Sequence, residues 1–221
     1  QINFLVEENK IYAHGEIELS PHLRFLVFAD TSNLELSLLR KFIPELPYQE
    51  GHLRFYIDYI GVPTDFTGQI YITGRLDSLN LNRISSKYQY RKRNLNLQDV
   101  HIQTNFGSLG GSILVAPESK NNIAINFREI NLKKPGFSEE ETNINGYLRL
   151  NFNTWNLSQI TGAGMMQLTD LRYGQVKLDT LFMNLEAQDG FWTLKDGSRL
   201  VVQKESQFYV NGVMSNERML D

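Results

Sequence analysis

The sequence contains no cysteine, and this absence removes several classes of site at once. A chain of 221 residues without cysteine has no disulfide framework, no cysteine-ligated zinc, no iron–sulfur cluster and no cysteine nucleophile. Histidine is scarce as well, and none of the four histidines forms a close metal-like pair. His52 and His101 alternate with apolar residues, which predicts that they lie on the polar faces of strands. The sequence therefore predicts no metal site and no cofactor.

Charge of one sign and long hydrophobic runs are also missing. The net charge of −3 argues against a general nucleic-acid binder, because phosphate affinity comes from many Lys and Arg side chains acting together. No run approaches the roughly 20 consecutive apolar residues of a membrane-spanning helix, and no basic-then-apolar leader opens the chain. The chain starts at Gln1 and is strand-like by Phe4. We therefore expect a piece of a longer protein, with any membrane anchor outside it.

The common catalytic motifs are absent too. The sequence has no nucleophile elbow, Walker loop, dinucleotide fingerprint or zinc-protease helix. The glycines of residues 107–111 come closest to a phosphate cradle, but they lead into a strand rather than a helix N-terminus. The acidic cluster 139–141 follows Pro135-Gly136 in an evident loop. We therefore predict that the chain is not an enzyme.

What the sequence has instead is a recurring phrase: a glycine, one variable residue, then apolar residues at every second position. Copies occur at residues 51–57, 68–72, 111–115, 146–152 and 174–178. Because successive side chains of a strand point to opposite faces, each copy predicts a strand with one apolar and one polar face. The repeated phrase therefore predicts a sheet of many strands that has one apolar face and one polar face.

Proline and turn signals divide the chain into short strands. All six prolines lie between or at the ends of alternating runs, as expected of a residue that cannot donate to a sheet ladder. We expect strands near residues 2–7, 11–19, 23–29, 51–60, 67–76, 84–91, 95–106, 109–116, 122–132, 143–153, 163–170, 173–187, 191–195, 199–204 and 207–214. Turns are expected at Asp189-Gly190, Asp196-Gly197 and Asn211-Gly212.

One segment departs from this pattern. Apolar residues at near-helical spacing follow the cluster Thr31-Ser32-Asn33, whose side chains suit a helix N-cap, and precede Pro44. One short amphipathic helix is therefore expected near residues 33–42. A weak internal repeat also relates residues 51–81 to 146–178, since each begins with Gly-x-Leu-Arg and restarts at a glycine. We expect residues 1–221 to form a single segment.

This pattern resembles the AsmA and TamB superfamily of bacterial envelope proteins. The residues that carry the resemblance are 34–39, 42–46, 51–55, 68–72, 110–113 and 160–168, so it extends over most of the chain. The resemblance implies an all-β fold: an elongated, curved antiparallel sheet that forms an open, taco-like groove with an apolar interior. It implies a periplasmic location in the envelope of a Gram-negative-type bacterium, with an inner-membrane anchor outside this chain.

The resemblance also implies a function as part of a bridge-like lipid transport protein. Phospholipids or other acyl lipids would move along the groove between the inner and outer membranes, and an outer-membrane protein is a further expected partner. Nucleic acid is not expected to bind. The expected lining residues are Leu53, Phe55, Ile57, Ile70, Ile72, Leu148, Leu150, Phe152, Met166, Leu168, Leu181, Met183 and Leu185.

A basic, tyrosine-containing stretch is the second candidate site. Residues 87–93 mix basic and aromatic side chains, as single-strand nucleic-acid binders and lipid-headgroup sites do. The expected headgroup contacts are Lys87, Arg91, Lys92 and Arg93. The alternation places Tyr88 and Tyr90 on one face with Lys87 and Arg91 on the other, and a strand that ends in a solvated turn would give the same pattern.

Two other functions fit the same pattern. One-sided strands look alike whether their apolar faces meet lipid or another sheet, so a structural or adhesive β-module with a closed core remains open. So does a lipopolysaccharide-bridge domain of the jelly-roll type, whose interior would also be apolar.

Overall fold

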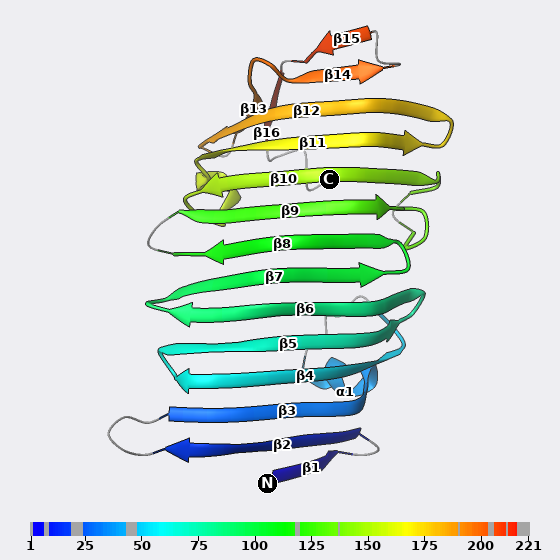
Figure 1. Ribbon diagram of the computed structural model, residues 1–221. Helices are drawn as coiled ribbons and strands as arrows, with labels where there is room; N and C mark the ends of the chain where they lie inside the picture. The colour runs from blue at the N-terminus through cyan, green and yellow to red at the C-terminus, as the bar shows by residue number, and fades with distance from the viewer. Residues whose placement is uncertain are drawn as a thin grey trace. The chain divides into compact units, whose positions relative to one another are not determined.

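The computed structural model describes residues 2–6, 9–18, 24–42, 48–117, 120–136, 138–189, 191–202, 206–210 and 212–215. Contacts divide the chain into two units, unit 1 (residues 1–105) and unit 2 (residues 106–221). In each unit the strands are antiparallel and belong to an open sheet (Figure 1). The prediction of an all-β, open antiparallel architecture is confirmed.

Unit 1 is a sheet in which each strand pairs with the strand before it and the strand after it in sequence. Its elements are β1 (Ile2–Val6), β2 (Asn9–Glu18), β3 (Arg24–Glu35), α1 (Leu36–Phe42), β4 (Gly51–Val62), β5 (Asp65–Leu76), β6 (Leu79–Arg91) and β7 (Asn94–Thr104). The helix α1 follows β3 directly and contacts β3 and β4.

Unit 2 begins with the same kind of sequential pairing, from β8 to β12. At its other end, two short strands share the edge of β12. Its elements are β8 (Gly107–Val115), β9 (Asn121–Ile130), β10 (Thr142–Phe152), the 3₁₀ turn η1 (Leu157–Gln159), β11 (Gly162–Tyr173), β12 (Val176–Gln188), β13 (Phe191–Leu194), β14 (Arg199–Val202), β15 (Ser206–Tyr209) and β16 (Gly212–Ser215). Both β13 and β14 pair with β12, while β15 pairs with β14 and β16 with β13.

Strand β4 shows why the alternating sequence folds in this way. Leu53, Phe55 and Ile57 are half-buried, whereas His52 and Arg54 between them are exposed. A strand is the conformation that separates such a period-two pattern onto two faces. Since burying an aliphatic side chain contributes about 1.5–3 kcal/mol, this alternation sets the register as well as the strand.

The expected helix at residues 33–42 is shorter than predicted. The helix α1 begins at Leu36, and residues 31–33, expected to cap it, belong to β3. A β-bulge in β3 places Leu34 opposite Leu53, where only 5% of Leu34 is exposed. Burial of Leu34 in the sheet outweighs a hydroxyl cap, which is worth about 1 kcal/mol.

Bulges also explain a strand end that the sequence misplaced. Strand β6 begins at Leu79 rather than near residue 84, because the pairing shifts between Leu81 and Arg83 and the alternation is interrupted there. The side chain of Leu81 is 7% exposed and lies opposite Gly74. A strand predicted from period-two alternation ends at such a shift, whereas the actual strand continues through it.

The Asp196-Gly197 turn is not a hairpin. Strands β13 and β14 both run antiparallel to β12 and pair with different parts of it. The turn therefore separates two consecutive strands that run in the same direction along β12. Ser198, 1% exposed, fills the interruption: its Oγ accepts from the Asn184 amide at 3.0 Å and donates to the Lys195 carbonyl at 2.8 Å. Of the other expected turns, Asp189 directly follows β12 and has φ of 50°, whereas Gly190 and Asn211 lie outside the described residues.

Candidate functional site

The predicted lining residues of unit 1 lie on one face of its sheet. They are Leu53, Phe55, Ile57, Ile70 and Ile72, and all five are half-buried. Phe55 of β4 lies opposite Ile72 of β5, and Ile57 lies opposite Ile70. The row continues into β6, where Ile84 is opposite Ile72. Apolar side chains therefore form rows that run across the strands.

Unit 2 repeats this arrangement in its own sheet. Its predicted lining residues are Leu148, Leu150, Phe152, Met166, Leu168, Leu181, Met183 and Leu185. Leu148 of β10 is opposite Met166 of β11, which is opposite Met183 of β12. Leu168 is opposite Leu181 in the next row. The registers therefore bring these residues together on one face of unit 2, as they do in unit 1.

Glycines interrupt these rows where neighbouring backbones approach closely. Gly146 lies between Phe127 and Leu168, with φ of +153°. A Cβ atom at Gly146 would lie 2.0 Å from the carbonyl oxygen of Gln167. Only glycine tolerates both this conformation and this approach, which explains why the recurring phrase begins with glycine here.

A loop covers one end of the apolar face of unit 2. Ile160, from the segment between β10 and β11, packs with Phe152 and Ala187 in a buried cluster, and Phe152 is only 3% exposed. The Trp155 ring contacts Phe152 edge-on at 4.8 Å, and its Nε1 donates to the buried Asn121 side chain at 3.1 Å. Phe152, predicted to line a groove, is therefore covered by this chain's own loop.

Unit 1 has instead a chain of aromatic contacts near one end of its strands. We call Phe25, Tyr59, Phe66, Tyr88 and Tyr90 the aromatic cluster. Tyr59 and Phe66 have ring centroids 4.7 Å apart, and Phe66 stacks on Tyr90 at 5.0 Å. Phe25 meets Tyr59 edge-on at 6.4 Å, and Tyr88 meets Phe66 at 6.1 Å. These contacts make the apolar face aromatic where β4 and β6 end and β5 begins.

Tyr88 is fixed in this cluster by a backbone contact across two strands. Its hydroxyl donates to the carbonyl oxygen of Asp58, and its ring lies over Gly68, where an added Cβ would be 2.6 Å from the Tyr88 Cζ. The Asp58 carboxylate accepts from the Gln69 amide at 2.6 Å. Burial raises the pKa of Tyr88, and the Asp58 charge raises it further. The hydroxyl thus remains a neutral donor.

Substitution of Tyr88 by phenylalanine is expected to lower the free energy of unfolding by about 1–2 kcal/mol, because it leaves the Asp58 carbonyl without this donor. Urea unfolding of the purified chain measures the change. Tyr90→Phe is the matched control, since the Tyr90 hydroxyl has no hydrogen-bond partner among the described residues. Equal losses in the two variants would show that the Tyr88 contact contributes nothing.

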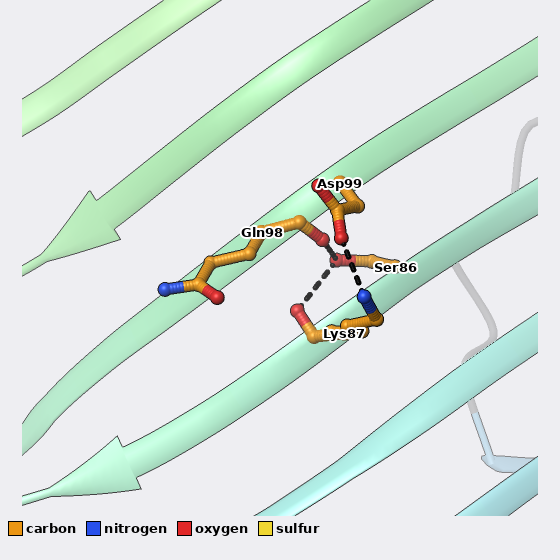
Figure 2. Close-up of polar contacts among 4 residues, drawn as sticks. All are labelled: Ser86, Lys87, Gln98 and Asp99. Atoms are coloured by element: carbon orange, nitrogen blue, oxygen red, sulfur yellow. Dashed lines mark hydrogen bonds and ion pairs between the residues drawn. The ribbon is translucent and has the colours of Figure 1, made fainter.

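The basic stretch divides between the two faces as the alternation predicts. Lys87 projects to the polar face and its Nζ lies 2.8 Å from the Asp99 carboxylate, which raises the pKa of Lys87 (Figure 2). A β-bulge with Asp99 at φ of 51° presents this carboxylate, and the Ser86 hydroxyl donates to the Gln98 carbonyl beside it at 3.0 Å. Lys87 therefore has a protein partner.

The other three basic residues lie at the end of β6. The Arg91 guanidinium is 3.2 Å from the Asp65 carboxylate on the polar side of the sheet. Lys92 and Arg93 form the two-residue turn between β6 and β7, and both are exposed. Of the predicted headgroup contacts, Lys87 and Arg91 thus lie on β6 beside carboxylates, and Lys92 and Arg93 form the turn that follows.

Beside Lys87, the polar face of unit 1 holds a hollow of about 300 Å³. Tyr56, Tyr71, Arg83 and Asp99 contribute to its lining, and the Arg83 guanidinium lies 5.9 Å from the centre of the Tyr71 ring. This lining offers hydrogen-bond donors, acceptors and an aromatic surface. It lies on the opposite face of the sheet from the apolar rows.

No family model matches this chain, and neither does any curated protein or solved structure. The resemblance to the AsmA and TamB superfamily therefore stays a prediction from the residues quoted for it. In the described part of the chain, no group of three or more His, Asp or Glu side chains is placed to hold a metal ion. No helix of that part is long and apolar enough to cross a membrane.

Two parts of the site were not found from the sequence. The aromatic cluster joins residues of β3, β4, β5 and β6, and its members become neighbours only through the register. The cover over Phe152 was missed because residues 153–161 read as a polar turn. Ile160, apolar among polar neighbours, was the available signal.

Proposed function

We propose that this chain shields the acyl chains of phospholipids along its apolar faces, as a periplasmic part of a bridge-like lipid transport protein. The observation that supports this most is the set of half-buried apolar rows crossing neighbouring strands in each unit. Among the described elements, extensive contacts join neighbouring strands, with α1 against β3 and β4 as the addition. The apolar side chains of these rows are half-buried and so keep part of their surface exposed, which supports the proposal.

The energetics favour such a surface as a path for lipid. Each methylene removed from water contributes about 0.8 kcal/mol, so a 16-carbon chain gains roughly 12 kcal/mol of shielding. Contacts between aliphatic groups are non-directional, so a tail can slide from one row to the next without breaking specific bonds. Rows that cross the strands would provide contacts for this movement.

The proposal includes the shape and setting that the resemblance implies. The sheet would curve into an open, taco-like groove, with the apolar rows inside and the polar faces outside. The inner-membrane anchor would lie in another part of the parent protein, and transport would run between the inner and outer membranes. An outer-membrane protein would be a further partner.

The decisive experiment is to purify the chain without detergent and to identify bound lipids by native mass spectrometry and lipid extraction. We expect diacyl phospholipid to co-purify with folded protein. Well-folded protein without lipid, which also takes up none from added vesicles, would instead support a structural β-module.

The buried cluster of Phe152, Ile160 and Ala187 favours that alternative locally, because a closed core would consist of such contacts. The lipid that co-purifies also separates the remaining alternative: lipopolysaccharide in place of phospholipid would indicate a jelly-roll-type bridge.

A further inference from the structure

Two tyrosines lie side by side on the polar face of unit 1. Tyr56 of β4 is opposite Tyr71 of β5, and side chains that face each other in this way have Cβ atoms about 4.5–5.5 Å apart. Both remain partly exposed, Tyr56 by 39% and Tyr71 by 41%. On the next strand Ser85 is opposite Tyr71, and all three residues line the hollow of about 300 Å³. The hollow therefore has a partly exposed aromatic surface.

Side chains that can still form hydrogen bonds also line the hollow. The Gln69 side chain is exposed and has no hydrogen-bond partner among the described residues, so its amide group offers donors and an acceptor. The Arg83 Nε donates to the Ser85 Oγ at 3.1 Å, which leaves the terminal N–H groups of Arg83 for another acceptor. A β-bulge brings the exposed Asp99 carboxylate to the same place. The hollow thus offers donors and acceptors next to an aromatic surface.

The charges around the hollow balance one another. Two basic side chains, Arg83 and Lys87, contribute to its lining, and so does the Asp99 carboxylate, which pairs with Lys87 (Figure 2). A second carboxylate, that of Asp58, accepts from the Tyr56 hydroxyl at 3.4 Å and from a backbone amide at 2.6 Å. An ionic ligand is bound by an excess of the opposite charge, which these four groups together do not supply. The hollow therefore suits an uncharged ligand.

An uncharged pyranose sugar matches this combination of groups. One side of a pyranose ring presents C–H groups that pack on an aromatic ring, and its edge carries hydroxyl groups that both donate and accept. Sites for small molecules combine aromatic side chains with a few polar groups, and their volumes begin at about 300 Å³. The hollow beside Tyr56 and Tyr71 has this lining and this volume. An acyl chain would instead leave the polar groups of the lining without partners.

We propose that the polar face of unit 1 binds one ring of an uncharged saccharide, stacked on Tyr56 and Tyr71. The Arg83 guanidinium would donate to the hydroxyl groups of that ring, the Asp99 carboxylate would accept from them, and the Gln69 side chain would do both. This site lies on the opposite face of the sheet from the apolar rows. The inference therefore does not depend on the proposed lipid function.

The test uses the complete chain, isotope-labelled, and follows its amide NMR signals during titration with three uncharged tetrasaccharides: maltotetraose, cellotetraose and tetra-N-acetylchitotetraose. We expect at least one of them to shift the signals of residues 69–71 and 83–87 in a saturable way. Sorbitol, which carries hydroxyl groups but has no pyranose ring, is expected to leave these signals unchanged at the same concentration.

Tyr71→Ala is expected to weaken saccharide binding at least about tenfold, the loss common when a central aromatic contact is truncated. The matched control is Tyr173→Ala, which removes another exposed tyrosine at the end of β11 in unit 2 and should bind like the wild type. Circular dichroism checks that both variants are folded. Gln69→Ala is a second variant at an exposed position, and the loss of its hydrogen bonds to the sugar should weaken binding at least about threefold.

Several results would overturn this inference. A folded wild-type chain that binds none of the three tetrasaccharides does so, as does sorbitol binding with equal affinity. Saccharide binding that neither Tyr71→Ala nor Gln69→Ala weakens would place the site elsewhere, and a preference for the acidic trigalacturonate would contradict the charge argument. Lipid uptake is measured separately, so none of these results decides the proposed function.

Discussion

Substitution of Gly146 by valine is expected to destabilise unit 2 by at least about 4 kcal/mol, which is a large part of the stability of an ordinary domain. The added Cβ would meet the Gln167 carbonyl oxygen at 2.0 Å, and a valine does not adopt the φ of +153° found there. Because the obstacle is backbone, no side-chain rotation relieves it. Urea unfolding followed by circular dichroism measures the loss.

Gly212→Val provides the control for this substitution. Gly212 also lies in a strand, β16, but no atom of the described residues comes within 4 Å of a Cβ built there. The control is expected to change the free energy of unfolding by about 0.5 kcal/mol or less. A Gly146→Val chain that unfolds at the same urea concentration as this control would mean that β10 and β11 are not paired in the described register.

The second large effect is expected from Ile72→Asp, which should reduce lipid uptake at least tenfold while the chain stays folded. Ile72 lies in the middle of an apolar row, between Phe55 and Ile84, and it is half-buried. A carboxylate there disrupts the path of an acyl chain, because charge is costly to remove from water. In the absence of lipid the same carboxylate can reach solvent, so the fold is expected to survive. Lipid uptake from vesicles and circular dichroism give the two readouts.

Tyr71→Asp is the matched control, since it introduces the same charge at the residue before Ile72 in β5, on the opposite face of the sheet. It should leave lipid uptake unchanged. If Ile72→Asp unfolds the chain, Ile72 lies in a closed core; if the folded variant takes up lipid normally, Ile72 does not line the path. Leu150, an equivalent position by sequence, is less suitable because it packs against the buried Phe152 cluster.

Much of the fold could be predicted because period-two alternation is a local property. The strands around Leu53 and Leu148 follow from it directly, and so does the opposite placement of Lys87 and Tyr88. In a one-sided sheet the pattern that forms a strand also decides which face is apolar. The candidate lining residues therefore came from the same signal as the fold.

What could not be predicted depends on register and on contacts distant in sequence. The bulge that presents Asp99 to Lys87 shifts the pairing without a glycine to mark it, and the Tyr88 hydroxyl reaches a carbonyl 30 residues earlier. The cover over Phe152 depends on how residues 153–161 fold back. Sequence alternation says which face a residue takes, but not what lies above that face.

The sequential pairing of the strands has a consequence for how such a protein changes its length. In unit 1 each strand bonds with the strands that precede and follow it, so inserting or deleting a hairpin leaves every other pairing in place. Evolution can therefore lengthen or shorten the sheet two strands at a time while the pairing of the remaining strands is kept.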